Sequence, residues 1–203
     1  MKLYYYPGAC SMAVHIALRE AGYAFDLDKV DLAAKTTAGG EDYNQVNAKG
    51  YVPALRLDDG EVLTEVAAIL QYLADHKPDA GLAPPAGSLA HYRLLEWLNF
   101  IATEIHKTLG ALFNPQAGPD WKADRIALFT RRAGWLDGQL ADRPFLMGTD
   151  FSVADAYLFT VLRWCGLMQI DLGPWPGLRG YMARIAERPA VQAAMQAEGL
   201  TGG

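Results

Sequence analysis

The chain has 203 residues, 51% of them apolar and 20% charged, which is enough for one large domain or two small ones with a real hydrophobic core. Its 18 basic and 23 acidic side chains give a net charge of -5, and the absence of a dense Lys or Arg run excludes an obvious nucleic-acid partner. Because no segment reaches membrane-spanning length, and two cysteines and four scattered histidines make neither a disulfide framework nor a metal site, we expect a cytoplasmic protein without metal or membrane partner.

The first thirty residues have the pattern of a strand, a helix and a second strand. The run KLYYY is followed by a Pro-Gly turn, an apolar-periodic helix that stops at Gly22, and a strand that ends near Asp31. Cys10 lies where the helix begins, and there the unpaired N–H groups and the helix dipole favour a thiolate over a thiol. The position suits a reactive sulfur, although most free cysteines are small buried apolar residues.

Residues 32–76 complete the first predicted domain. Residues 32–40 read as a loop, and residues 41–46 as a short helical piece. The runs ALRL and EVLT, joined by Asp58, Asp59 and Gly60, predict a β-hairpin, and a helix is predicted to follow from Glu65 to Asp75. The order is therefore βαβ, short helix, ββα.

The remainder of the chain predicts an all-helical domain. Residues 78–87 are rich in Pro, Gly and Ala and predict a linker between a domain of residues 1–77 and one of residues 88–203. The segment from Val153 to Leu167 is apolar on nearly all sides, which predicts a central buried helix, and Ser152 to Asp155 form a capping box at its start. The predicted helices are residues 88–112, 120–140, 153–168, 177–188 and 190–198.

Two backbone positions in the first domain have the chemistry of a peptide-binding edge. Pro53 forces Val52 into an extended conformation, so the N–H and C=O of Val52 can pair with an extended peptide, or Val52 simply enters the next strand. Glu65 and Val66 begin a helix, so their N–H groups suit a carboxylate and the Glu65 side chain suits an ammonium. The alternative is that Glu65 only complements the helix dipole.

A polar stripe marks the first helix of the second domain. Asn99, Thr103 and His106 are four and three residues apart, which places them on one face of a helix that is otherwise apolar. The stripe faces something polar, either a ligand or a solvated or inter-subunit seam. Cys165 lies in the apolar central helix and is interpreted as a core residue.

Essentially the whole chain resembles a cytosolic glutathione transferase, with a thioredoxin-like α/β domain followed by an all-α domain. The opening KLYYYPGACS, together with Asn99, Thr103 and His106, is similar to the bacterial beta class, which has a cysteine where other classes use tyrosine or serine. The resemblance implies a homodimer that binds the tripeptide glutathione as co-substrate. It also implies that the peptide bond between Val52 and Pro53 is cis, which a sequence cannot show.

The resemblance further implies a role for each matching residue. Lys35, which is otherwise an ordinary solvated loop lysine, would meet the glycine carboxylate of glutathione, His106 would lie near Cys10, and Glu104 would reach the glutathione of the partner subunit. Many relatives have a serine where this chain has Val66, which offers only its backbone. The implied glutathione-binding residues are Cys10, Lys35, Val52, Pro53, Glu65, Val66, Asn99, Thr103, Glu104 and His106.

The leading hypothesis is therefore a glutathione S-transferase that conjugates the glutathione thiol to small apolar electrophiles. The helix start at Cys10, the Ser11 hydroxyl and His106 are the available stabilisers of the thiolate. A rival hypothesis is a thiol-disulfide oxidoreductase in which Cys10 forms a mixed disulfide with glutathione; no second cysteine stands three residues on, so only a monothiol route is open. A third hypothesis is a non-catalytic interaction module of the same fold.

Overall fold

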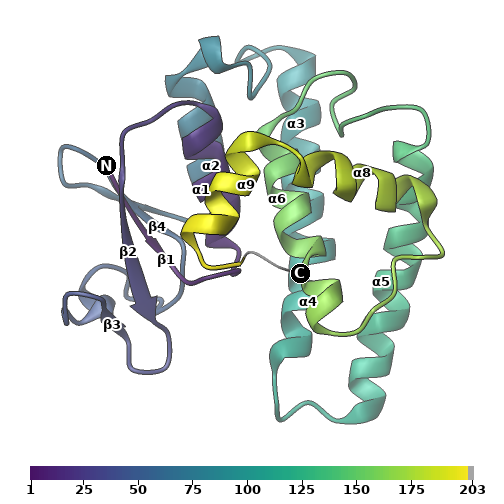
Figure 1. The fold of residues 1–203 in the computed structure, drawn as a ribbon, viewed down its shortest axis with the longest axis horizontal. Helices are drawn as coiled ribbons and strands as arrows, with labels where there is room; N and C mark the ends of the chain where they lie inside the picture. Colours follow the sequence, from purple (N-terminus) through teal and green to yellow (C-terminus); the bar gives the residue numbers. More distant parts are fainter. Residues whose placement is uncertain (201–203) are drawn as a thin grey trace. The chain divides into compact units, whose positions relative to one another are not determined.

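The computed structural model of the protein describes residues 1–200 and divides into two compact units (Figure 1). The first unit consists of Met1–Ala83 together with residues 188–200, and the second unit of Pro84–Glu187. The first unit thus includes a terminal segment that the sequence analysis assigns to the helical domain. The reason lies in the packing of the last helix, described below.

A five-stranded mixed sheet organises the first unit. The strands are β1 (Lys2–Tyr5), β2 (Asp26–Asp31), β3 (Thr36–Thr37), β4 (Ala54–Arg56) and β5 (Val62–Thr64), in the spatial order β3-β2-β1-β4-β5. β1 and β2 are parallel and every other pair is antiparallel, so the predicted hairpin of β4 and β5 is confirmed. β3 lies in a segment predicted to be a loop, because two residues are too few to give a recognisable alternation.

Three helices pack within the first unit. α1 (Ser11–Glu20) and α2 (Val66–His76) contact each other beside the sheet, and α9 (Pro189–Ala197) packs against α1 (Figure 1). Two short 3₁₀ turns, η1 (Tyr43–Gln45) and η2 (Pro78–Ala80), complete the unit. The predicted order of βαβ, short helix and ββα is confirmed.

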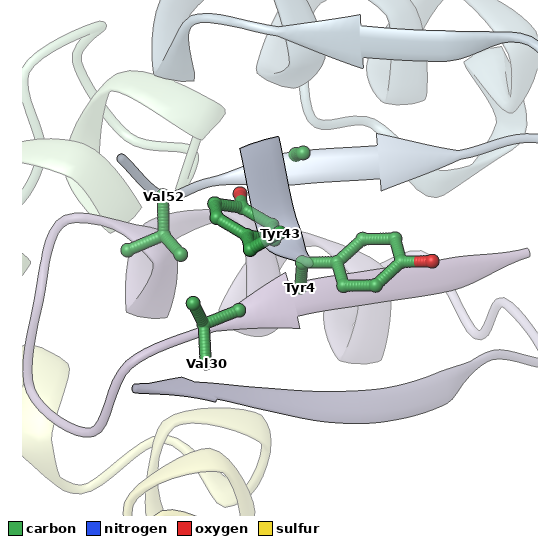
Figure 2. Close-up of a cluster of buried hydrophobic side chains, with 5 residues drawn as sticks. Tyr4, Val30, Tyr43 and Val52 are labelled. Atoms are coloured by element: carbon green, nitrogen blue, oxygen red, sulfur yellow. The ribbon is translucent and has the colours of Figure 1, made fainter. Parts of the chain in front are cut away.

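The central strand of the sheet, β1, is buried on both faces. Leu3 and Tyr4 follow one another in β1, point to opposite faces and are both fully buried. Tyr43, from η1, packs with Tyr4 in a cluster that also holds Val30, Val52 and Ala54; the rings of the two tyrosines lie 5.7 Å apart, centroid to centroid (Figure 2). Burial raises the pKa of Tyr43 to about 12. The cluster anchors the side chain of Val52, just before Pro53, in the core.

A buried chain of polar groups ties the end of the described chain to the loop before Cys10. Arg19 Nε donates to His15 Nε2 at 2.8 Å, and His15 Nδ1 lies 2.8 Å from Glu198 Oε1. Because a guanidinium can only donate, Nε2 of His15 accepts and its proton resides on Nδ1, which donates to Glu198. Glu198 Oε2 in turn accepts the N–H of Gly8 at 2.9 Å. These contacts explain why α9 belongs to the first unit.

The second unit is all-helical, as predicted. Its helices are α3 (Leu89–Phe100), the π-helix η3 (Ile101–His106), α4 (Lys107–Gly110), η4 (Ala111–Phe113), α5 (Pro119–Leu140), α6 (Val153–Leu162), α7 (Trp164–Leu167) and α8 (Pro176–Ala186). The segment predicted as one helix over residues 88–112 is therefore divided by the π-helical turn. No helix within residues 1–200 is both long and apolar enough to cross a membrane.

The predicted central helix over residues 153–168 is confirmed as far as Leu162: the ten residues of α6 are all buried, but after Arg163 the chain continues as the separate short helix α7, where Leu167 is exposed. The capping box at its start is also confirmed, and the Asp155 carboxylate accepts hydrogen bonds from Ser152 N at 2.8 Å and Ser152 Oγ at 2.7 Å. The same carboxylate accepts from Leu146 N at 2.8 Å and from Tyr181 Oη at 3.1 Å. Asp155 thus joins three separate segments of the unit.

We predict that Asp155→Ala lowers the free energy of unfolding by roughly 3 kcal/mol or more, because it leaves several buried donors without an acceptor. Urea denaturation followed by circular dichroism measures this change. Asp142→Ala, at an exposed position, is the control and should change the stability by no more than about 0.5 kcal/mol. Equal stabilities for the two variants would contradict the role given to Asp155.

Candidate functional site

The loop that carries Cys10 is closed by its neighbour in sequence. Ser11 Oγ donates to the carbonyl oxygen of Tyr6 at 3.3 Å and accepts the N–H of Tyr6 at 3.3 Å. Ser11 is fully buried and is the first residue of α1, whereas Cys10 is the helix N-cap and is half-buried. The hydroxyl of Ser11 therefore fixes the loop from Tyr6 to Cys10, and the thiol remains partly accessible.

The Cys10 thiol lies beside the residue that precedes Pro53. Its Sγ donates to the carbonyl oxygen of Val52 at 3.3 Å, and the peptide bond between Val52 and Pro53 is cis. A thiolate has no hydrogen to donate to a carbonyl, so this contact stabilises the protonated thiol. The structure thus sets two effects against each other at Cys10: the start of α1 favours the anion, and the contact with Val52 favours the thiol.

Side chains from three segments hold the backbone just before Val52. Lys35 Nζ donates to the carbonyl of Gly50 at 2.6 Å. The carbonyl of Tyr51 accepts from Tyr43 Oη at 3.1 Å and from Asn47 Nδ2 at 2.6 Å. We name the segment from Asn47 to Pro53 the 47–53 loop. Three hydrogen bonds to two consecutive carbonyls define its path, and Lys35 is one of the donors.

Glu65 lies at the start of α2 with its side chain toward the 47–53 loop. Its φ of +70° is rare for a residue with a side chain, and its carboxylate forms an ion pair with Lys49 Nζ. Tyr51 Oη donates to the same carboxylate oxygen at 3.1 Å. The hydrogen bond to Glu65 raises the pKa of Lys49. The next residue, Val66, is buried and opens α2, so only its backbone faces the helix start.

Lys49, Tyr51 and Asn47 are not among the site residues predicted from the sequence. Lys49 and Tyr51 could have been predicted from the hairpin, because its register pairs Ala54 with Thr64. In an antiparallel pair, the chain that enters the first strand lies beside the chain that leaves the second. The segment before β4 must therefore approach the residue after β5, which is Glu65.

Asn99 and Thr103, the first two residues of the polar stripe of the second unit, contact the preceding turn of the chain. Asn99 Nδ2 donates to the carbonyl of Leu95 at 2.8 Å, and Thr103 Oγ1 donates to the carbonyl of Asn99 at 3.0 Å. Glu104 forms an ion pair with Arg132 of α5, with 2.7 Å between Oε2 and the nearer guanidinium nitrogen. Each of these side chains has a partner in the same unit.

His106 lies at the end of the π-helix, among aromatic side chains. Its Nδ1 lies 2.6 Å from Tyr157 Oη, and its ring meets the rings of Tyr157 and Trp164 edge to face, with centroids 5.7 and 5.1 Å apart. π-Helical turns are frequent at functional sites. The neighbouring Cys165 is buried in the core, as predicted, and burial raises its pKa to about 12.

The predicted site residues fall into one group in each unit. Cys10, Lys35, Val52, Pro53, Glu65 and Val66 belong to the first unit, and Asn99, Thr103, Glu104 and His106 to the second. Within residues 1–200, no three His, Cys, Asp or Glu side chains gather in a way that suits a metal ion. The first group has the parts of a peptide site: a backbone edge, a thiol, a carboxylate and a helix start.

Comparison with known proteins identifies the same family in both halves of the chain. Residues 8–76 match the model of the glutathione S-transferase N-terminal domain, and residues 96–184 match that of the C-terminal domain. The chain is 48% identical to glutathione S-transferase GstA of Escherichia coli O157:H7, over 98% of this chain and 100% of that protein.

Solved structures agree with this match over nearly the full length. A sphingomonad glutathione S-transferase complexed with glutathione superposes with a TM-score of 0.96 at 50% identity, covering 99% of this chain and 100% of that one. The bacterial beta-class glutathione S-transferase of Sphingomonas chungbukensis gives the same TM-score of 0.96, identity of 50% and coverage of 99% and 100%. The chain therefore belongs to the glutathione S-transferase family, and its structural neighbours include the bacterial beta class.

Proposed function

We propose that this glutathione transferase holds glutathione, its co-substrate, along the 47–53 loop and the start of α2, and conjugates the glutathione thiol to a small apolar electrophile. One observation carries the proposal for the site. The Cys10 thiol donates to the Val52 carbonyl at 3.3 Å, so a sulfur nucleophile and a backbone edge suited to a peptide lie within contact distance.

Each part of glutathione has a complementary group in the first unit. The backbone of Val52 would pair with the cysteinyl residue in the manner of an added strand. Glu65 would receive the γ-glutamyl ammonium, and the N–H of Val66 would receive the α-carboxylate at the start of α2. Lys35 already donates to Gly50 and would meet the glycine carboxylate from there.

The reaction needs a glutathione thiolate next to an electrophilic carbon. The sulfur forms a bond to that carbon, and the leaving group departs with the electron pair of the broken bond. Proximity and stabilisation of the thiolate supply the rate, and the start of α1 is the stabiliser that the first unit offers. A peptide N–H on the Val52 carbonyl would take the acceptor that the Cys10 thiol now uses. Ser11, which is hydrogen-bonded to Tyr6, would position the loop from Tyr6 to Cys10.

We also propose Asn99, Thr103, Glu104 and His106 as binding residues of the second unit. The imidazole of His106 is oriented by Tyr157 and Trp164, which suits it to interact with a sulfur anion. Glu104 is paired with Arg132, so a contact between Glu104 and the glutathione of a partner subunit would need this pair to rearrange. From the resemblance to cytosolic glutathione transferases, we also propose that the protein is a cytoplasmic homodimer.

The oxidoreductase and the interaction module are not favoured. Two relatives that the chain covers over their whole length, at 48% and 37% identity, are named glutathione S-transferases, and the chain keeps the thiol, the peptide edge and the acidic residue at the helix start. The variant Cys10→Ala distinguishes a monothiol reaction at Cys10 from conjugation.

We predict that Cys10→Ala keeps conjugating activity toward an aromatic halide within about tenfold of the unaltered protein, because the glutathione sulfur is the nucleophile. Mixed-disulfide formation with glutathione should vanish, as mass spectrometry of the intact protein would show. Cys165→Ala is the matched control, since its sulfur is buried, and should leave the mixed disulfide in place. Loss of conjugation in Cys10→Ala alone would instead make Cys10 the nucleophile.

We predict that Glu65→Gln weakens glutathione binding roughly 10- to 100-fold, the range expected for a lost hydrogen bond between charged groups. Isothermal titration calorimetry measures the Kd. Glu61→Gln removes the same charge from an exposed position in the hairpin and serves as the control. An unchanged Kd in Glu65→Gln would reject Glu65 as the ammonium site.

We predict that the purified chain is a dimer in light scattering coupled to size-exclusion chromatography, at micromolar concentration and in the presence of glutathione. A strict monomer with full glutathione-transferase activity would remove any role for Glu104 across subunits.

A further inference from the structure

The carboxylate proposed to hold the glutathione ammonium is already occupied by a cation of the chain. We infer that Lys49 is an internal counter-ion that the γ-glutamyl ammonium displaces, so that Lys49 determines how strongly the site prefers ligands with a free amino group. This inference rests on the proposed function, because it concerns the same Glu65. Lys49 is not among the predicted site residues, so it would be an additional residue that determines specificity.

Three contacts hold Lys49 in the position that a ligand ammonium would take. Its Nζ pairs with Glu65 Oε1, donates to Thr64 Oγ1 at 2.9 Å, and lies 5.7 Å from the centre of the Tyr51 ring. An ammonium group surrounded by a carboxylate, a hydroxyl and an aromatic face has the same environment that an α-ammonium would seek. Lys49 thus stands in for the ligand group.

The ion pair is exposed enough to exchange. The side chains of Lys49 and Glu65 are 43% and 57% exposed, and ion pairs of that exposure contribute little to stability because water solvates both partners. Lys49 has a long flexible stem, so its ammonium can move into solvent without any change in the backbone. Tyr51 Oη, a neutral donor on the same oxygen, does not repel an incoming cation.

Displacement of Lys49 by the ligand ammonium is favoured over both cations sharing Glu65, because Glu65 Oε1 already has two donors. Lys49 Nζ and Tyr51 Oη both contact Glu65 Oε1. A second ammonium at this edge would lie within a few ångströms of Nζ, where like charges repel. Release of Lys49 removes the repulsion, and the ligand ammonium keeps the same carboxylate, hydroxyl and ring.

A difference in selectivity follows. Glutathione must break the pair of Lys49 and Glu65, whereas a peptide without the amino group leaves it intact and gains nothing from Glu65. The lysine therefore weakens the binding of glutathione and leaves that of the analogue unchanged. Its removal should widen the preference for glutathione, even though glutathione carries a net negative charge.

The experiment measures the Kd of two probes, glutathione and glutaryl-cysteinyl-glycine, which lacks only the amino group. In Lys49→Met, which keeps the apolar stem, glutathione should bind roughly two- to fivefold more tightly and the analogue should bind as before. Lys49→Gln should behave in the same way. Lys29→Met, at an exposed position on β2, controls for the change in net charge and should leave both Kd values unchanged.

Each other outcome overturns the inference. Weaker binding of both probes by Lys49→Met would make Lys49 a ligand of a glutathione carboxylate. Equal tightening of both probes would place its effect away from the amino group, and unchanged values would make it a bystander. Failure of the unaltered protein to bind glutathione would instead defeat the proposed function, and this result is distinct from all of the others.

Discussion

The hydrogen bonds that hold the 47–53 loop are the constraint on which the first unit's site depends. A chain segment without regular structure has no ladder to fix it, so side chains must satisfy and orient its carbonyls. Tyr43 and Asn47 do this at Tyr51, and Lys35 does it at Gly50. With these carbonyls fixed, Val52 contacts the Cys10 thiol, and Lys49 and Tyr51 contact Glu65.

In the proposed site, the thiol and the carboxylate share a design in which the chain's own groups occupy the positions that a ligand would take. The Cys10 thiol uses the Val52 carbonyl, and Lys49 uses Glu65. Polar groups without partners are costly where water is scarce, as at the buried Val52, and less so at the exposed Lys49 and Glu65, but the chain satisfies both with these internal contacts. They also mean that affinity depends on the difference between two sets of contacts, and not on the ligand's contacts alone.

The parts of the fold that depend on local chemistry could be predicted from the sequence. Ser152 and Asp155 predict the start of α6, and Gly60 predicts the hairpin, because each residue affects the backbone only within a few residues of itself. The position of Cys10 at the start of a helix was predictable for the same reason. The π-helical turn before His106 and the packing of α9 were not predictable, whereas the approach of Lys49 to Glu65 could have been inferred from the register of the hairpin. The packing of α9 depends on contacts between distant segments, such as His15 with Glu198, 183 residues apart.

The return of α9 to the first unit affects how the nascent protein matures. Glu198 accepts the N–H of Gly8, so the loop beside Cys10 gains this hydrogen bond only after residue 198 has left the ribosome. The helical unit spans Pro84–Glu187, so all of its residues are synthesised earlier. Domains generally fold as units during synthesis, and here the one that begins the polypeptide is completed last.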